Sequence, residues 1–348
     1  MKRFDFIGNR RRGSIISVVL LSVTALTLIF SGLNFSIDFV GGSSFVIDDV
    51  TNAELTVTDL QDAASGAGAT DVTAQIRQDG DVIVGALVQS EELPPGSPEL
   101  DAVRTALMDV AGSEQINFTT VGPSWGQRIS SKAIRALIVF LIVVVAYISL
   151  RLEPLMAVAS VVALVHDVAI TVGIYALVGF TISPSTVIAI LTILGYSLYD
   201  SVVVFDRVQE NRPKLGESGH RTLGESVNTS LNDVLWRSVN TSVTSLLPVG
   251  SLLFVGSQLL GADTLADLAL ALFLGMAIGA YSSIFVAVPL YATLKERDPE
   301  MTKLAAKAKR QALASGEEVL TTSSVEAEKG PITTEYVRGG GKKRRTKR

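Results

Sequence analysis

The chain has 348 residues, of which 48% are hydrophobic, and its formal net charge is −4. Soluble proteins of this length rarely reach a mean hydropathy of +0.40, so the composition favours a membrane protein. The sequence contains no cysteine and only two histidines, which excludes disulfides and thiolate metal sites and argues against a histidine-rich metal site. We therefore expect neither a metal nor a cofactor.

Long apolar runs recur along the chain, beginning near the N-terminus. A helix needs roughly 20 residues to cross a hydrocarbon core about 30 Å thick. By this measure the sequence predicts six spans, at Ser14–Leu33, Ala133–Leu150, Leu155–Phe180, Pro184–Phe205, Ser238–Leu259 and Leu265–Tyr291. The predicted fold class is a multi-pass α-helical membrane protein with six transmembrane helices.

The longest segment between spans, residues 34–130, has a different pattern that predicts a small folded domain. Its predicted elements, in chain order, are a strand at Ser43–Ile47, a helix at Val57–Ala67, strands at Val72–Arg77 and Val82–Val88 joined by a hairpin turn, a helix at Leu100–Val110 and a strand at Gln115–Val121. The order β-α-β-β-α-β is typical of a split, ferredoxin-like unit. We therefore expect a small α+β domain beside the membrane bundle.

Lysine and arginine are distributed unevenly among the segments between spans. Residues 1–13 and the loop 206–237 are basic, whereas residues 34–130 are acidic. Because basic loops stay in the cytoplasm, this pattern predicts an extracytoplasmic α+β domain and cytoplasmic termini, with residues 131–294 forming the remaining bundle. Lys132 and Arg135 are exceptions at the outer edge of the second span, where long side chains can snorkel to the interface.

The tail, residues 295–348, begins with a helical pattern and then becomes rich in Ser, Thr, Glu and Gly. This composition predicts that most of the tail is disordered. Its basic cluster, Lys342–Arg345, is expected to attract anionic lipid rather than nucleic acid.

Four ionisable residues fall within or beside the predicted spans, namely His166, Asp167, Asp200 and Arg237. A charge at mid-bilayer costs roughly 2.5–3.5 kcal/mol, so each is a functional hypothesis by default. At a rise of 1.5 Å per residue, Asp200 lies about 20 Å below the outer edge of its span, and His166 lies about 17 Å above the inner edge of its own. These depths nearly coincide, and we expect the two helices to face each other there.

Arg237 opens a span whose inner half is unusually polar, and such residues hydrogen-bond between helices or line a wet path. We predict that Asp200 and Arg237 couple to protons, because protonating a buried aspartate would break an ion pair and bias a two-state element. The predicted supporting polar network consists of His166, Asp167, Asn240, Thr241 and Ser242.

Other interpretations are open at this stage. A buried Asp–Arg pair can simply fix helix register, and the chain can be a structural scaffold or half of a small-molecule exporter. Tyr199-Asp200 superficially matches the Tyr-Asp motif of intramembrane aspartyl proteases, but the second motif, Gly-x-Gly-Asp, is absent from the sequence. The sequence also lacks a Gly-x-x-x-x-Gly-Lys-Ser/Thr loop, which favours a gradient over ATP as the energy source.

The segment Gly195–Arg207 resembles the fourth-span signature of the SecF family, the smaller half of the bacterial SecD/SecF translocation motor. Further motifs agree with that family in order and spacing, at Ile37–Gly42, Val121–Gly126, Ala163–Asp167, Arg237–Ser242 and Tyr281–Phe285. The resemblance covers about Gly8 to Leu294. Tyr199 departs from it, since many relatives carry a small or polar residue at that position.

The resemblance implies a non-enzymatic membrane protein related to the resistance-nodulation-division transporters, located in the bacterial cell membrane. It implies pairing with SecD, association with the SecYEG channel and with YajC, and contact with unfolded secreted polypeptide. The implied function is to use the proton motive force to help these polypeptides finish crossing the membrane. In that family the residues that match Asp200 and Arg237 are tied to proton coupling.

Overall fold

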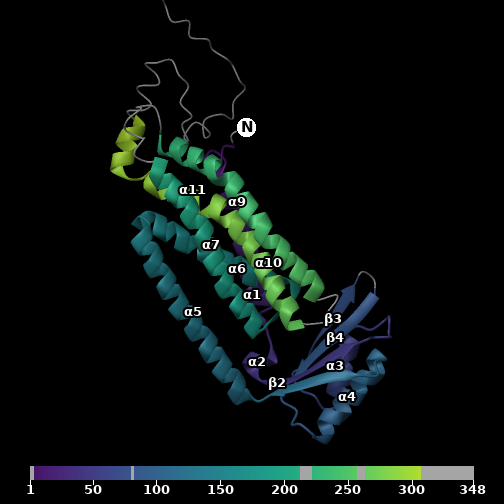
Figure 1. Ribbon diagram of the computed structural model, residues 1–348. Coiled ribbons are helices and arrows are strands. Elements are labelled where there is room, and N and C mark those ends of the chain that lie inside the picture. Colours follow the sequence, from purple (N-terminus) through teal and green to yellow (C-terminus); the bar gives the residue numbers. More distant parts are fainter. Residues whose placement is uncertain (1–3, 80–81, 212–221, 257–262, 307–348) are drawn as a thin grey trace, which may run out of the picture.

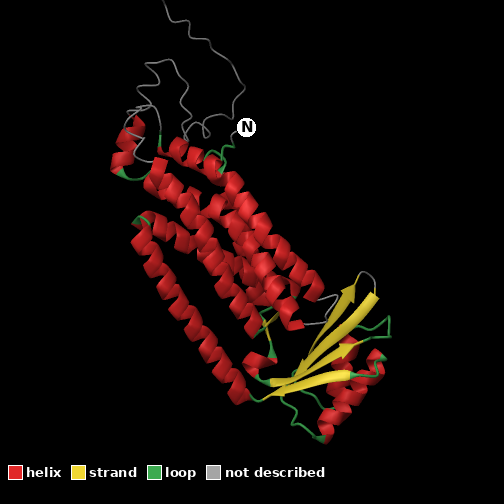
Figure 2. Ribbon diagram, viewed as in Figure 1, coloured by secondary structure: helices red, strands yellow, loops and turns green. Residues whose placement is uncertain are grey.

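The computed structural model describes residues 4–79, 82–211, 222–256 and 263–306 (Figure 1). A bundle of long helices carries a small α+β domain at one end (Figure 2). Five helical segments of the described residues are long and apolar enough to cross a membrane: α1 (Arg10–Phe30), α5 (Pro123–Arg151), α6 (Pro154–Val178), α7 (Pro184–Asn211) and Leu265–Lys295. The prediction of a multi-pass helical membrane protein is confirmed.

Helix α9 (Leu223–Phe254) corresponds to the remaining predicted span, Ser238–Leu259, but it is not among these five segments. Its polar residues lower its hydropathy, although it packs against α7 and α10 like the other helices of the bundle. Residues 257–259 of the predicted span lie outside the described residues.

The predicted loop 206–237 is largely helical where the structure describes it, because α7 continues to Asn211 and α9 already begins at Leu223. The start of α9 is stabilised by Thr222, whose hydroxyl accepts a hydrogen bond from the Glu225 amide in a capping box. The predicted tail lies outside the described residues from residue 307 onward, and so does its basic cluster. Residues 212–221 of the predicted loop are also outside them.

The last long helical segment contains a π-helical turn in its middle. It consists of α10 (Asp263–Ser282), the π-helix η2 (Ser283–Ala287) and α11 (Val288–Lys295). Gly275 and Gly279 of α10 lie against α7, and a Cβ on Gly279 would come within 3.2 Å of the Ser197 Cβ. Small residues let the backbones approach closely here, as the spacing of Gly275, Gly279 and Ser283 predicts.

The α+β domain follows the predicted element order. Its elements are β2 (Gly42–Asp48), α3 (Val57–Gly66), β3 (Thr73–Asp79), β4 (Val82–Ser90), α4 (Pro98–Ala111) and β5 (Ile116–Val121). The sheet order is β3-β4-β2-β5, and all neighbouring strands are antiparallel. Helices α3 and α4 cover one face of the sheet (Figure 1), and Phe45, Leu60 and Leu107 are fully buried between the layers. Residues 80–81 of the predicted hairpin turn lie outside the described residues.

Two features join this domain to the bundle, and the sequence pattern did not predict them. A two-residue strand β1 (Asn34–Phe35) pairs in parallel with β6 (Thr181–Ile182), and the short helix α2 (Ile37–Val40) packs on α5. Helix α5 begins at Pro123, directly after β5, so the last residues of the predicted segment 34–130 belong to this helix. A single helix therefore runs from the sheet into the bundle.

Gly41 and Gly42 allow the sharp turn between α2 and β2. Their φ angles are +83° and +133°, and a Cβ on Gly41 would lie 2.8 Å from the Pro123 Cα. A Cβ on Gly42 would overlap the carbonyl oxygen of Ser90. Only glycine adopts these angles at this close approach without strain.

Replacing Gly42 by alanine is expected to destabilise the protein by roughly 1–3 kcal/mol, because the new Cβ meets backbone in a strained conformation. Thermal unfolding of the detergent-solubilised full chain measures the effect. The matched control is Gly66→Ala, since no heavy atom lies within 4 Å of a Cβ at Gly66. Equal melting temperatures for the two variants would contradict the steric explanation.

Candidate functional site

The carboxylate of Asp200 lies inside the helical bundle, with 5% of the residue exposed. The Ser238 hydroxyl of α9 lies 2.7 Å from one carboxylate oxygen and 2.8 Å from the other. The Ser283 hydroxyl, from the first residue of η2, donates a hydrogen bond to the same carboxylate. One acidic group on α7 therefore contacts both α9 and the π-helical turn.

A second buried carboxylate, Asp167 on α6, is fully inaccessible to solvent. The Ser197 hydroxyl donates a 2.6 Å hydrogen bond to one of its oxygens, and His166 Nδ1 lies 3.2 Å from the other. His166 is itself buried, and its Nε2 has no hydrogen-bond partner among the described residues. This acid–imidazole pair is linked to α7 through Ser197.

The two carboxylates are organised by the same stretch of α7. Ser197 precedes Asp200 by three residues, which places both side chains on neighbouring positions of one helical face. A Cβ at Gly279 would lie 3.7 Å from the nearer Asp167 oxygen and 3.4 Å from the Ser197 hydroxyl. The glycine thus leaves room for the hydrogen bond between Asp167 on α6 and Ser197 on α7. This contact lies one turn away from Asp200, whose own partners are on α9 and η2.

Arg237 does not contact Asp200. The Arg237 side chain is exposed on α9, and it forms no ion pair with any of the described residues. Its neighbour Ser238 points inward and reaches Asp200 instead. The in-chain ion pair considered from the sequence is therefore replaced by a set of hydroxyl groups around the carboxylate.

The other predicted network residues on α9 do not reach either carboxylate. Asn240 is exposed, and the Thr241 hydroxyl bonds to the carbonyl oxygens of Arg237 and Ser238. Ser242 is buried and donates to the carbonyl oxygen of Ser238. In the described residues neither Thr241 nor Ser242 bonds to Asp200, because the hydroxyls of both bond to backbone carbonyl oxygens of their own helix.

Ser197, Ser238 and Ser283 were not predicted as site residues. Serine is common in membrane helices, so its presence alone carries little information. Two signals were available: Ser283 continues the Gly275–Gly279 spacing of four, and Ser197 lies one turn before Asp200. Neither signal identifies the acceptor of each hydroxyl, which depends on how the helices pack.

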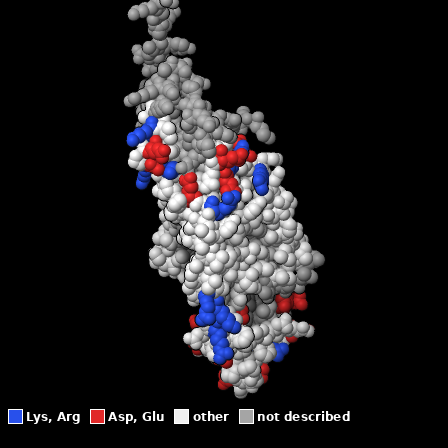
Figure 3. All heavy atoms as spheres, turned by 60° about the vertical axis from the view of Figure 1, so that its left-hand side comes forward, with Lys and Arg blue, Asp and Glu red and all other residues white. Residues whose placement is uncertain are grey.

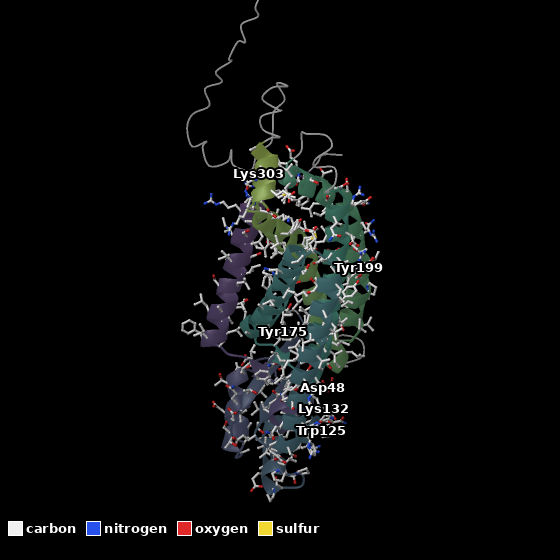
Figure 4. The ribbon with its side chains drawn as sticks, turned by 90° about the vertical axis from the view of Figure 1, so that its left-hand side faces the viewer. Asp48, Trp125, Lys132, Tyr175, Tyr199 and Lys303 are labelled. Carbon is white, nitrogen blue, oxygen red and sulfur yellow. The ribbon has the colours of Figure 1, made fainter. Side chains whose placement is uncertain are left out.

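The hydrogen-bond donors around both buried carboxylates include serine hydroxyls. A serine hydroxyl both donates and accepts hydrogen bonds, so it can satisfy a carboxylate and also its protonated form. Among the described residues, no cluster of His, Asp or Glu could hold a metal ion. Tyr199, next to Asp200 in sequence, lies at the surface of the bundle (Figure 4).

A concavity of about 810 Å³ separates the uncovered face of the sheet from the end of the bundle. Its wall on the domain side is mixed, with Gln75, Arg77 and Gln89 beside Val46 and Leu87, while its floor includes Phe180 and Leu270. Gln75 bridges the two parts, because its amide nitrogen donates to the Gly179 carbonyl and to the Thr181 hydroxyl.

Comparisons with known proteins agree on a single family. The family model described as protein export membrane protein SecD/SecF, C-terminal, matches residues 102–297, and the SecD/SecF GG motif matches residues 27–48. The glycines of that motif region include Gly41 and Gly42, whose backbone angles are described above. The protein translocase subunit SecF of Streptomyces coelicolor is 43% identical, over 90% of this chain and 83% of its own length.

Comparison with solved structures gives the same result. A crystal structure of SecDF from Thermus thermophilus, described as a translocon-associated membrane protein, is 37% identical with a TM-score of 0.71. The match covers 85% of this chain and 39% of the SecDF chain, so the relative is much longer. The SecF of Mycobacterium tuberculosis is 38% identical over 84% of this chain. The chain belongs to the SecF proteins of the SecD/SecF family of protein export membrane proteins.

Proposed function

We propose that this chain works with SecD in the bacterial cell membrane, where it uses the proton motive force to promote late stages of preprotein translocation. The translocase relatives support the export role, and the SecDF relative supports the pairing with SecD. The observation that carries the energy-coupling part is the buried carboxylate of Asp200, which is hydrogen-bonded by hydroxyl groups from two further helical elements.

Protonation of Asp200 would change how three elements pack. An ionised carboxylate only accepts hydrogen bonds, whereas its protonated form also donates one. Ser238 on α9 and Ser283 on η2 would then have to exchange donor and acceptor roles or separate. A π-helical turn adds a residue to its helix and is often found at functional sites, so η2 is the element best suited to shift. Binding and release of one proton would thus bias the bundle between two arrangements.

Arg237 has a separate role in this proposal. Because adjacent Ser238 contacts Asp200, the Arg237 backbone lies at about the same depth in the bundle, yet its side chain points outward. A guanidinium facing hydrocarbon there would cost roughly 2.5–3.5 kcal/mol, so we expect a partner to cover it. We propose that SecD covers this face of α9, with Asn240 beside the arginine, and completes the proton-coupling site.

The proposal includes a topology. In this topology α9 also crosses the membrane and brings the number of spans to six, since its polar face would meet a protein partner rather than lipid. The proposal also takes the α+β domain as ferredoxin-like and extracytoplasmic, with both termini cytoplasmic. The concavity between sheet and bundle then opens toward emerging polypeptide, near the SecYEG channel and YajC.

A small-molecule exporter of the same superfamily is the competing function. Two assays distinguish these functions in cells depleted of the chain: export of a labelled preprotein and accumulation of a labelled drug. The proposal predicts a loss of preprotein export with unchanged drug accumulation, and restoration of export when the chain is expressed again. Increased drug accumulation with normal export would contradict it.

A further inference from the structure

Three basic side chains form a stripe along the first turns of α5. Arg128, Lys132 and Arg135 are spaced four and three residues apart, which places them on one face of the helix, and all three are exposed. Trp125, one turn earlier on the same face, is 56% exposed. Figure 3 shows the basic side chains as a continuous patch, and Figure 4 shows Trp125 beside Lys132. We call these residues the α5 basic stripe.

The stripe faces away from the rest of the chain. The opposite face of α5 is the one that packs inward, through Gly126, Ser130 and Val144. Among the described residues no acidic group forms an ion pair with a member of the stripe. The stripe therefore has no structural role within the described part of the fold, and its three charges are available to a ligand.

The same face changes from basic to apolar along the helix. Beyond Arg135 it continues through Val139 and Ile142, which are 55% and 63% exposed. Lys132 and Arg151 are separated by about 28 Å at 1.5 Å per residue, close to the thickness of one hydrocarbon core. Arg151 pairs with Asp206 at the end of the helix farther from the α+β domain. With Arg151 at one membrane surface, this separation places Lys132 near the opposite surface, beside the α+β domain.

From this geometry we propose that the α5 basic stripe binds the headgroup of an anionic phospholipid. The phosphodiester contacts Arg128, Lys132 and Arg135, and an acyl chain lies along Val139 and Ile142. A tryptophan at headgroup depth completes the site, as is usual at a membrane interface. Along this helix face a cationic half is followed by an apolar half, as in the order of headgroup and acyl chain in a lipid molecule. An acidic protein surface fits the face less well, because it would leave the apolar half without a complementary contact.

The chain contains only two tryptophans, which provides a direct probe of this site. In a Trp236→Phe background, fluorescence reports Trp125 alone. The full chain is reconstituted in phosphatidylcholine vesicles that contain a minor fraction of phosphatidylglycerol. In one sample the phosphatidylglycerol carries a spin-label quencher, and in the other an equal fraction of the phosphatidylcholine carries it. We expect about a fivefold preference of the site for labelled phosphatidylglycerol, decreasing at high salt.

Neutralising the stripe with Arg128→Gln, Lys132→Gln and Arg135→Gln is expected to abolish the preference. The charge-matched control replaces Arg11, Arg12 and Lys303, which are exposed at the other end of the bundle, by glutamine and is expected to keep it. Equal quenching by both lipids in the unmodified stripe would overturn the proposal, as would a preference that survives neutralisation. Protection of Trp125 from both lipids on co-reconstitution with SecD would also overturn it, because the stripe would then be a protein interface.

Discussion

Replacing Asp200 by asparagine is expected to reduce preprotein release in the presence of a proton gradient to the rate measured without one. Asparagine keeps the size of the side chain and can still bond to Ser238 and Ser283, but it cannot bind and release a proton in the physiological range. The substitution should lower the unfolding free energy by about 1 kcal/mol. Late-stage release of a labelled preprotein from membrane vesicles, with and without an imposed gradient, measures the effect.

The matched control is Asp206→Asn on the same helix. Asp206 is partly exposed and pairs with Arg151, 3.0 Å away, so it lies near the end of the bundle rather than in its interior. Surface ion pairs contribute little to stability, and we expect this variant to retain gradient-dependent release. If the Asp200 variant released preprotein as fast as the unmodified protein under a gradient, Asp200 would have no part in energy coupling.

Replacing Gly279 by leucine is the second substitution with a large expected effect. The new side chain would occupy the space where α10 meets Ser197 and Asp167, so α10 must move away from α7. The leucine side chain would press on the hydrogen bond between Ser197 and Asp167, and the movement of α10, through the following π-helical turn, would displace Ser283 from Asp200. We expect a loss of roughly 1–3 kcal/mol in unfolding free energy. We also expect preprotein release under a gradient to be no faster than release without one.

Gly195→Leu provides the control for the second substitution. Gly195 lies on α7 close to the same region, but no heavy atom lies within 4 Å of a Cβ built there. The same glycine-to-leucine change should therefore leave both thermal stability and release nearly unchanged. A Gly279 variant as stable and as active as the Gly195 variant would show that close packing of α10 on α7 is not required.

The sequence predicted most helices and strands because their local patterns are strong. Alternation in residues 73–90 and apolar runs such as Leu155–Phe180 specify the element type without knowledge of neighbours. The helix ends were less well predicted, as at Pro123 and Leu223, because amphipathic or polar turns continue a helix past its apolar part. The pairing of β1 with β6 was missed, since two-residue strands far apart in the chain have no local signature.

The candidate site was predicted in part for a similar reason. An acidic residue in an apolar run is conspicuous, so Asp167 and Asp200 could be identified from the free-energy cost of placing a charge in the membrane. Which side chain of a helix faces a given neighbour depends on how the helices pack. Asp200 contacts Ser238 and not Arg237, although the two residues are adjacent in the sequence. The hydroxyl donors on α9 and η2 became evident only from the packed structure.

Infrared difference spectroscopy of the Asp200 carboxyl group tests most directly whether this side chain exchanges a proton inside the bundle. Spectra of the reconstituted full chain at acidic and alkaline pH are compared with those of the Asp200→Asn variant. The account predicts a carboxylic C=O band that appears on acidification in the unmodified protein, shifts in heavy water and is missing from the variant. Identical difference spectra for the two proteins would contradict it, because Asp200 would then keep one protonation state throughout.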